Sequence, residues 1–308
     1  MIELRKITKN FGNIQALDNF SFDVKKGELF GLLGPNGAGK STTINLLSTF
    51  IAPDKGEIFL NGISHKKATL KMKMSIGVIP QEIALYDDLS ALENLQFWGD
   101  IYQIPTKELK NRITEMLKMV GLFGRRKDKI KTFSGGMKRR INIAAGLLHN
   151  PNIILMDEPT VGVDPQSRNF IFEMIKGLHQ IGKTIIYTTH YMEEAERLCQ
   201  RIAIIDQGKL IAIGTKEELY KLLGDSETII LELSKNLDIE QISHFFGNFI
   251  ISDLSENKIK IEGINLKNNL SEITTYLKRS FINIEKMDYI KPNLEKLFLK
   301  LTGKELRE

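Results

Sequence analysis

The chain has 308 residues, which is enough for one large domain with a small one or for two ordinary domains. Hydrophobic residues make up 42% and charged residues 26%, a balance typical of folded globular proteins, so wholesale disorder is excluded. The formal net charge of +5 fits an anionic ligand or a nearby anionic membrane surface, but it does not require nucleic acid.

The only cysteine is Cys199, so an intramolecular disulfide and a cysteine metal cluster are both excluded. Its surroundings, AERLCQR, have a helical pattern that predicts a small buried core residue. The first residues, MIELRKITKNFG, contain no apolar run typical of a signal peptide. No stretch approaches the roughly 18 apolar residues that span a bilayer. We therefore expect any role at a membrane to be carried out from the aqueous side.

The first part of the chain reads as strands that lead to a tight turn and a helix. Alternating or short apolar runs predict strands at Ile2–Leu4 and Phe20–Val24. The run Glu28–Leu33 is typical of a buried strand, and Gly34 closes it. A helix is predicted to start near Lys40.

Residues from about 85 to 150 are predicted to be mostly helical, because ALENLQFWGDIY and TKELKNRITEMLKMV carry apolar residues at spacings of three and four. Two short β-rich apolar runs follow, Ile153–Met156 and Thr184–Tyr187. Both are typical of parallel strands buried on two faces, and helical stretches separate them. The pattern predicts a doubly wound α/β core with a helical insertion.

After Gly224 the pattern changes, and residues 225–308 are predicted to form a small α/β appendage. Strands are expected at 228–233, 258–262 and 281–289, with a helix at 270–278. A last helix is expected between Pro292 and Gly303, with these apolar residues on one face: Leu294, Leu297, Phe298 and Leu301.

A glycine-rich segment between the buried strand and the first helix fits the pattern G-x-x-x-x-G-K-[ST]. Its glycines let successive backbone N–H groups point at an anion, and the helix N-terminus adds a positive dipole end. Lys40 supplies a mobile positive charge for the outer phosphates, and Ser41 can ligate Mg²⁺. The alternative, a glycine-rich turn without a ligand, is disfavoured by the strand, the full match and the helix together. The residues expected to bind the phosphates are Gly34, Pro35, Asn36, Gly37, Ala38, Gly39, Lys40, Ser41 and Thr42.

Polar residues follow three of the predicted strands. Asp157 and Glu158 end an apolar run at the edge where ligands meet an open α/β sheet. Asp157 is expected to hold Mg²⁺ through water, and Glu158 to orient and deprotonate the attacking water. Gln81 is a candidate for contact with Mg²⁺ or this water, and His190 for a hydrogen bond to the γ-phosphate. For Gln81 or His190 alone, a plain surface residue is the alternative.

The segment FSGGMKRR at residues 133–140 resembles the signature of ABC-type ATPases, and it precedes the acidic strand as in that family. The family's ordered set of motifs is present over residues 1–224: Phe11, the phosphate loop, Gln81, the signature, Asp157 with Glu158, Val163 with Asp164, and His190. The resemblance implies a P-loop NTPase core of the ABC type in residues 1–224, with an antiparallel β subdomain and a helical subdomain at about 85–150. Residues 225–308 would be a C-terminal accessory α/β domain.

The resemblance also implies how ATP is bound. Phe11 would stack on the adenine ring, and Ser134, Gly135 and Gly136 would bind the γ-phosphate of an ATP held by the other protomer. Neither protomer then has a complete site alone. The implied partner is a second copy of the chain or a homologous ATPase subunit. Opening and closing of this pair would be the power stroke.

Two residues depart from the usual motifs of the family. Met137 stands where Gln is usual, and Phe11 where the aromatic is often Tyr. The Met form resembles drug- and antibiotic-resistance exporters, and so does the ending PNLEKLFL with LTG at residues 292–299 and 301–303. This resemblance implies an ATPase subunit that couples ATP hydrolysis to export through a separate transmembrane permease subunit, at the cytoplasmic face of the cell membrane. The permease would dock near Leu85–Asp88 and Trp98.

Two other functions are weighed. A soluble ATPase of the same superfamily acts on ribosomes or chromosomes, and the basic segment 125–131 would then touch nucleic acid. Such proteins usually carry two nucleotide domains or long coiled-coil arms, and neither is predicted here, so no nucleic acid is expected. A regulator that binds ATP without hydrolysing it is disfavoured by the presence of both Glu158 and His190.

Overall fold

The computed structural model describes residues 2–67, 69–224, 226–235, 249–255, 257–264, 266–290 and 293–303. The chain forms two compact units, of which the first runs to Lys216 and the second begins at Glu217. The change of pattern that the sequence shows after Gly224 therefore lies inside the second unit, just after α8 (Lys216–Lys221). Pro292, expected near the start of the last helix, lies outside the described residues.

A six-stranded sheet forms the centre of the first unit, in the order β10-β9-β3-β8-β7-β6. All neighbouring strands are parallel except β10, which runs antiparallel to β9. Every residue of β3, β7 and β8 is buried, which explains why these strands read as continuous apolar runs rather than as alternating ones. The strands are β3 (Leu29–Leu33), β6 (Ile76–Ile79), β7 (Ile153–Asp157), β8 (Thr184–Thr189), β9 (Arg201–Asp206) and β10 (Lys209–Thr215).

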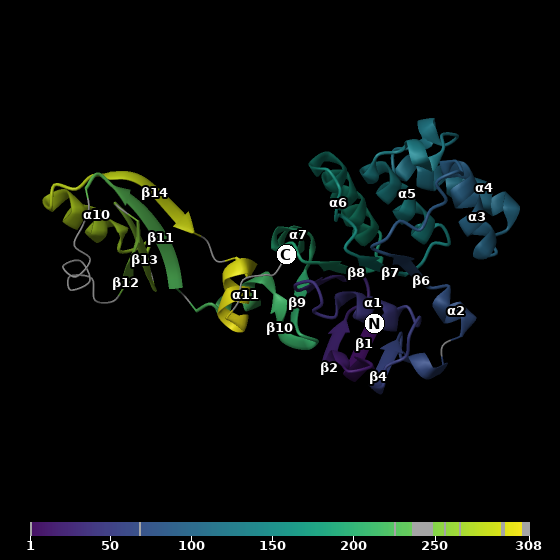
Figure 1. The fold of residues 1–308 in the computed structure, drawn as a ribbon, viewed down its shortest axis with the longest axis horizontal. Helices are drawn as coiled ribbons and strands as arrows, with labels where there is room; N and C mark the ends of the chain where they lie inside the picture. The colour runs from purple at the N-terminus through teal and green to yellow at the C-terminus, as the bar shows by residue number, and fades with distance from the viewer. Residues whose placement is uncertain are drawn as a thin grey trace. The chain divides into compact units, whose positions relative to one another are not determined.

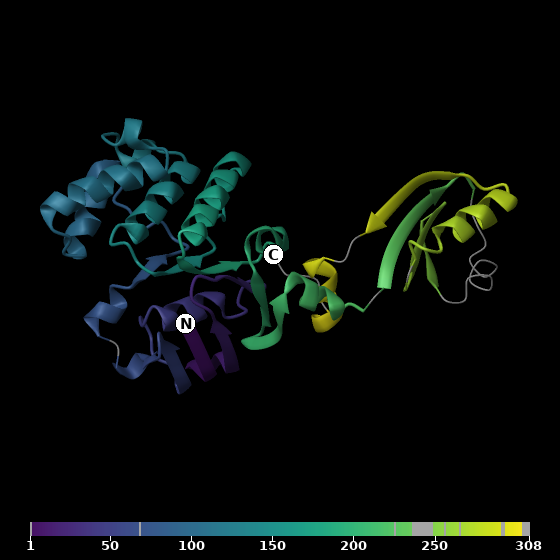
Figure 2. The same ribbon diagram turned by 180° about the vertical axis from the view of Figure 1, so that it is seen from behind.

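A second, antiparallel sheet has the order β2-β1-β4-β5. Between the two sheets lies α1 (Lys40–Leu47), whose residue Ile44 belongs to one buried cluster with Leu4 of the antiparallel sheet and Leu155 of the parallel sheet (Figures 1 and 2). Burial on both sides fixes this helix, and with it the loop that precedes it. The strands are β1 (Ile2–Phe11), β2 (Ile14–Val24), β4 (Lys55–Leu60) and β5 (Ile63–Ser64).

Helices cover the other face of the parallel sheet (Figure 1). Ser90 and Glu93 form a reciprocal capping box at the start of α3, and Asp164 caps α6, which begins at Pro165. The helical insertion predicted at about 85–150 is present as α3, α4 and α5. The helices are α2 (Leu70–Lys73), α3 (Ala91–Ile101), α4 (Thr106–Met119), α5 (Gly135–Leu147), α6 (Pro165–Gln180) and α7 (Met192–Leu198). Within the described part of the chain we find no helix with the length and hydrophobicity needed to cross a bilayer.

The second unit contains an antiparallel sheet of four strands in the order β12-β13-β11-β14. One face of the sheet packs on α10, because Ile229 and Leu231 of β11 share a buried core with Ile273 and Leu277 of the helix. The opposite face carries paired charges such as Lys260 with Glu262. The elements are β11 (Ser226–Leu233), β12 (Ile250–Ser255), β13 (Lys258–Ile264), α10 (Leu270–Arg279), β14 (Ile284–Ile290) and α11 (Leu294–Thr302).

Two local predictions need correction. The last strand was expected from Phe281 but begins at Ile284, because Phe281 has φ +55° and its N–H donates to Lys278 O at the end of α10. Cys199 was placed in a helical pattern but is the extended residue just after α7. It is buried, as expected, and it packs so closely on β3 that a side chain on Gly31 would collide with its sulfur.

Candidate functional site

The glycine-rich loop joins β3 to α1 and borders a cavity of about 610 Å³. Gly37 and Gly39 have φ values of 80° and 107°, in the left-handed region that favours glycine. Gly34 is needed for another reason, because a Cβ there would collide with the carbonyl of Ile205. The residues that line the cavity are Ile14, Gln15, Ala16, Asn36, Gly37, Gly39, Lys40, Ser41, Thr42, Gln81, Glu158 and Gln207.

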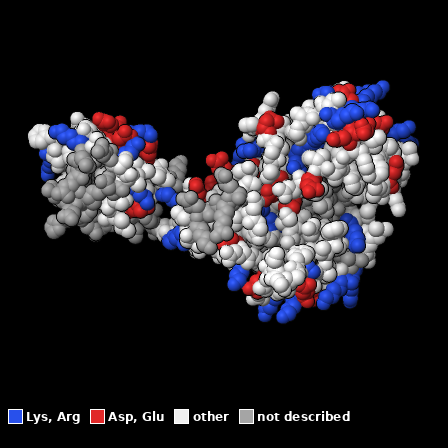
Figure 3. Space-filling model, in the orientation of Figure 1, with Lys and Arg blue, Asp and Glu red and all other residues white. Residues whose placement is uncertain are grey.

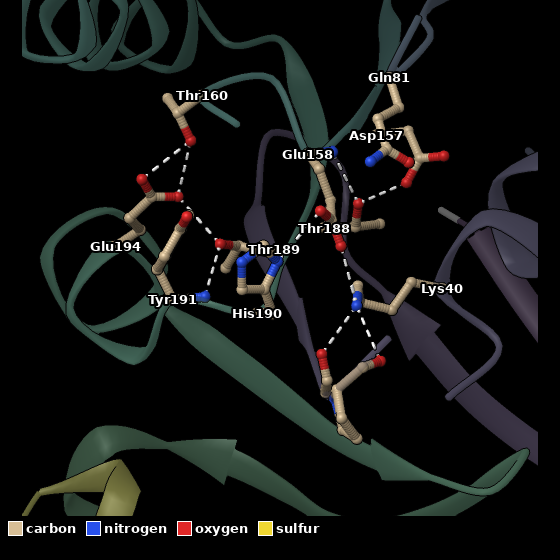
Figure 4. Close-up of polar contacts among 12 residues, drawn as sticks. Lys40, Gln81, Asp157, Glu158, Thr160, Thr188, Thr189, His190, Tyr191 and Glu194 are labelled. Atoms are coloured by element: carbon tan, nitrogen blue, oxygen red, sulfur yellow. Dashed lines mark hydrogen bonds and ion pairs between the residues drawn. The ribbon is translucent and has the colours of Figure 1, made fainter. Parts of the chain in front are cut away.

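Lys40 is the first residue of α1, and its ammonium group is turned back into the loop (Figure 4). Its Nζ donates to Gly34 O at 2.7 Å and to Pro35 O at 2.9 Å. The third contact is an ion pair with Glu158 Oε1 at 2.8 Å, and both side chains are only 4% exposed. An ammonium group has three hydrogens, so these contacts satisfy Lys40 completely in this structure.

Asp157 ends β7 and Glu158 follows it, as the sequence analysis expects. Glu158 has φ +45°, a strained conformation for a residue with a side chain. Thr188 of the neighbouring strand holds both residues: its hydroxyl accepts from the Glu158 N–H at 3.0 Å and donates to Asp157 Oδ1 at 2.7 Å. One threonine on β8 therefore holds the Asp157 carboxylate and the backbone of Glu158.

His190 directly follows β8 and meets Glu158 (Figure 4). The distance between His190 Nδ1 and Glu158 Oε2 is 3.0 Å. The two oxygens of Glu158 thus contact Lys40 on one side and His190 on the other. The structure brings together three residues that the sequence predicted separately.

Gln81 lies just after β6 and borders the same cavity. Its backbone is held by Arg139 of α5, which donates to Pro80 O at 2.9 Å and to Gln81 O at 2.6 Å. Arg139 is buried, which lowers the pKa of its guanidinium, while the charge of Asp157 acts in the opposite direction. The helix α5, which begins inside the signature, therefore positions the segment that carries Gln81.

Ser134, Gly135 and Gly136, here called the signature segment, do not line this cavity. Ser134 caps α5, with its Oγ accepting from the Met137 N–H at 3.3 Å. Gly136 lies against the start of α6, where an added Cβ would collide with the Ser167 side chain. The signature segment thus presents a helix N-terminus away from the chain's own phosphate loop.

Phe11, the expected adenine-stacking residue, also stands apart from the residues that line the cavity. It ends β1 with 49% of its surface exposed, and Lys9 Nζ lies 5.5 Å from the centre of its ring. Ile14, its partner across the β1–β2 turn, does line the cavity. The exposed ring is thus next to the cavity wall rather than in it.

Several residues around the cavity were missed by the sequence analysis. Gln15 lines it from β2 and Gln207 from the turn between β9 and β10, and the Gly208 N–H beside Gln207 donates to Ala38 O of the loop at 3.1 Å. Nothing in their local pattern marks them, since their places depend on how distant strands pair. Arg139 had a usable signal, because in a helix only one of three consecutive basic residues can face the core.

The oxygens of Ser41, Gln81 and Asp157 are of the kind that Mg²⁺ prefers. Ser41 and Gln81 both line the cavity. In the described ranges, no three or more His, Cys, Asp or Glu side chains are grouped to hold a metal by themselves. This set suits an ion that keeps several waters and shares phosphate oxygens with a nucleotide, as Mg²⁺ does.

Comparisons with known proteins agree on one family. A family model described as "ABC transporter" matches residues 17–161. The linearmycin resistance ATP-binding protein LnrL of Bacillus subtilis is 49% identical over 317 aligned positions, which cover 100% of each chain. A Nod factor export ATP-binding protein I of Cupriavidus metallidurans is 35% identical and covers 100% of this chain and 99% of its own length.

A similar solved structure is the dimeric ATP-binding cassette MJ0796 in a post-hydrolysis state bound to ADP and Pi. It is 31% identical, with a TM-score of 0.64, and the match covers 70% of this chain and 98% of that one. The similarity therefore extends over the fold that surrounds the cavity.

Proposed function

This chain belongs to the ATP-binding proteins of the ABC transporter family, and we propose that it is the ATP-hydrolysing subunit of an exporter whose membrane-spanning part is a separate protein. ATP hydrolysis is the activity of this family, and the related cassette was captured with ADP and Pi. Export is supported by the names of the relatives, one for linearmycin resistance and one for Nod factor export. The observation that carries the proposal is the buried contact of Glu158 with both Lys40 and His190.

ATP binding is assigned to the phosphate loop. The backbone N–H groups of Asn36, Gly37 and Gly39 and the N-terminus of α1 surround the phosphates, with the side chains of Ser41 and Thr42 beside them. Lys40 exchanges its contact with Glu158 for the outer phosphates. Phe11 packs its exposed ring on the adenine beside Ile14. When bound, Mg²⁺ would be held by Ser41, Gln81 and Asp157 and would neutralise phosphate charge.

Glu158 is the residue proposed to orient the attacking water and take its proton. Its carboxylate is freed for this task when Lys40 turns to the phosphates, while His190 keeps it in place from the other side. His190 is then between Glu158 and the γ-phosphate, and an imidazole ring with a hydrogen on both nitrogens can donate to both groups. Gln81 reaches the same space from the end of β6.

The second half of each ATP site is proposed to come from another subunit, a second copy of the chain or a homologous ATPase. The signature segment offers a capped helix N-terminus, which suits a phosphate, and it does not line the chain's own cavity. Each ATP then joins the phosphate loop of one subunit to the signature segment of the other. Hydrolysis changes the charge in that interface and drives its opening.

The membrane partner is proposed to dock on an apolar cavity of about 750 Å³ beside Gln81, which places the subunit at the cytoplasmic face of the membrane. Trp98 and Tyr102 of the helical insertion line it together with Phe50 and Pro80, and Phe50 is 81% exposed. Trp98 also donates from Nε1 to Ala84 O at 3.2 Å. Because Ala84 is three residues after Gln81, a movement of Gln81 would also move the side chains at this surface.

A nucleic-acid function is less well supported. In the face shown in Figure 3, Lys and Arg side chains over the helical insertion are interleaved with Asp and Glu. Within the basic segment 125–131, Arg125 pairs with Asp128 and Lys131 pairs with Asp88. Charges that are already paired on the surface give a weak counterion-release contribution to nucleic-acid binding.

The substitution Glu158→Gln tests the catalytic assignment. We expect ATP binding to persist while the turnover number falls by about 10²-fold or more, because the amide cannot accept the proton of the attacking water. Turnover is measured as phosphate release with ATP and Mg²⁺, and binding by titration calorimetry. Glu115→Gln, an exposed change on α4, is the control and keeps wild-type turnover. Wild-type turnover in Glu158→Gln would remove this residue from the catalytic step.

A further inference from the structure

Glu194 is a buried carboxylate that does not line the phosphate cavity. It lies in α7 and is only 3% exposed. Its nearest cation is Arg168, whose Nε lies 3.6 Å from Glu194 Oε1, too far for a hydrogen bond. A charge so deeply buried is costly unless hydrogen bonds compensate it. The hydrogen-bond donors around Glu194 therefore indicate its role in the structure.

Three hydroxyl groups bind this carboxylate, one from Thr160 after β7 and two from Tyr187 and Thr189 of β8; Figure 4 shows the two threonines. Thr160 contacts both carboxylate oxygens, at 2.8 and 2.9 Å. Tyr187 donates to Oε2 at 2.7 Å and Thr189 donates to Oε2 at 2.9 Å. Burial, and then the charge of Glu194, raise the pKa of the Tyr187 hydroxyl, so it stays protonated as a donor.

One of these contacts fixes the backbone on both sides of His190. Thr189 precedes His190, and its hydroxyl donates to Glu194. The same hydroxyl accepts from the N–H of Tyr191, which follows His190, at 2.9 Å. His190 thus lies between Thr189 and Tyr191, which are joined to each other by the one hydroxyl that also binds Glu194. The imidazole reaches Glu158 from this anchored turn.

Another contact fixes the segment that follows Glu158. Thr160 is two residues beyond Glu158, and the turn between them is closed by the Val161 N–H donating to Glu158 O at 3.3 Å. Glu158 itself holds the strained φ of +45°, which persists only where neighbouring contacts enforce it. Glu194 therefore binds Thr160, two residues after Glu158, and Thr189, the residue before His190.

We propose that Glu194 is a positioning residue that sets the distance between His190 and Glu158 by binding Thr160 and Thr189 at once. This inference rests on the proposed roles of Glu158 and His190. The carboxylate touches neither the cavity nor any reacting atom, since it does not line the site. It acts through the 3.0 Å contact between the imidazole and the catalytic carboxylate.

The substitution Glu194→Gln in the full chain tests this role. It keeps the side-chain shape but places an NH₂ donor against hydroxyl donors, which breaks part of the network. We expect the turnover number to fall by about 10²-fold, as for a small misplacement of catalytic groups. We expect KM for ATP to change by less than about threefold, because the phosphate loop is untouched. Glu193→Gln, the exposed neighbour in the same helix, is the matched control and keeps wild-type turnover.

Thr160→Val and Thr160→Ser give an independent pair of variants in case Glu194→Gln fails to fold. Valine keeps the shape of threonine without the hydroxyl, and we expect turnover to fall by about tenfold. Serine retains the hydroxyl and restores most of that loss. Thermal unfolding of each variant separates this effect from a general loss of stability. Equal turnover in the valine and serine variants would contradict the proposal.

A double mutant distinguishes a positioning role from a purely structural one. If Glu194 acts through His190, adding Glu194→Gln to His190→Ala lowers turnover by less than about twofold further. Losses that multiply, or wild-type turnover in Glu194→Gln alone, overturn the proposal. The proposed function is tested separately. It holds if the wild-type chain hydrolyses ATP and the Glu158→Gln variant does not, whatever Glu194→Gln does.

Discussion

The ammonium group of Lys40 can bind either Glu158 or the phosphates of ATP, but not both fully. In the structure its ammonium group is bound by two loop carbonyls and by Glu158, so ATP has to replace at least the Glu158 contact. A triphosphate offers more negative charge than one carboxylate, which makes the exchange favourable. The exchange also leaves Glu158 free at the moment when a γ-phosphate is present.

The variant Lys40→Ala tests this exchange. It removes the only ammonium group that lines the cavity among the described residues, and we expect the Kd for ATP to rise by at least about 10²-fold. Lys26→Ala, an exposed change before β3, is the control and binds ATP as the wild type does. Calorimetric titration with ATP and Mg²⁺ measures both. A Kd that stays at the wild-type value in Lys40→Ala would mean that the phosphates lie elsewhere.

At the residue scale, the sequence predicted correctly that polar residues lie at the ends of buried strands. Asp157 ends β7 and His190 follows β8, and the carboxyl ends of these neighbouring parallel strands meet at one edge of the sheet. The contact between Lys40 and Glu158 was not predictable, because it depends on side-chain conformations. Glu194 was missed because an acidic pair in a helix suggests solvent, although Leu198, four residues on, lies on the same buried face.

The start of α5 is the element whose packing is easiest to test. Gly135 and Gly136 are its first two residues, but only Gly136 is pressed against α6, where a Cβ would collide with Ser167. Around Gly135 the nearest atom to an added Cβ is Gly162 O at 3.7 Å, an ordinary contact. A side chain is therefore excluded by packing at Gly136 but not at Gly135.

Gly136→Ala is therefore expected to lower the free energy of unfolding by about 1–3 kcal/mol, as overpacking does. Gly135→Ala, the matched control for stability, is expected to change it by less than about 0.5 kcal/mol, since alanine suits a helix. Urea unfolding followed by circular dichroism compares the two. Equal stability of both variants would show that α5 and α6 are not packed as the structure has them.

Elements buried on both sides were the most predictable from sequence. The continuous apolar runs of β3, β7 and β8 stood out, since parallel strands have no solvent face. β4 was missed because it contains Gly56, whose φ of 86° accompanies an irregular pairing with β1. β1 and β2 extend well beyond their predicted cores, because pairing rather than apolar content sets their length.

On the scale of the whole molecule, the first unit carries two different parts of the proposed ATP site, and they lie apart. The cavity holds the phosphate loop, Gln81 and Glu158, whereas the signature segment lies outside it. A chain that kept both halves for itself would bring them together in one cavity. The arrangement instead suits two subunits in which each supplies what the other lacks. Sequence alone gave this pairing only through the family resemblance, because no local pattern shows which cavity a segment lines.

The measurement that tests this account most directly is the mass in solution of the Glu158→Gln variant with saturating ATP and Mg²⁺, determined by light scattering. We expect twice the 35.0 kDa mass of one chain with ATP and a single chain without it. Adding Ser134→Arg, which places a bulky side chain in the signature segment, is expected to restore the single-chain mass. A variant that binds ATP fully and yet remains at the single-chain mass would contradict the shared site.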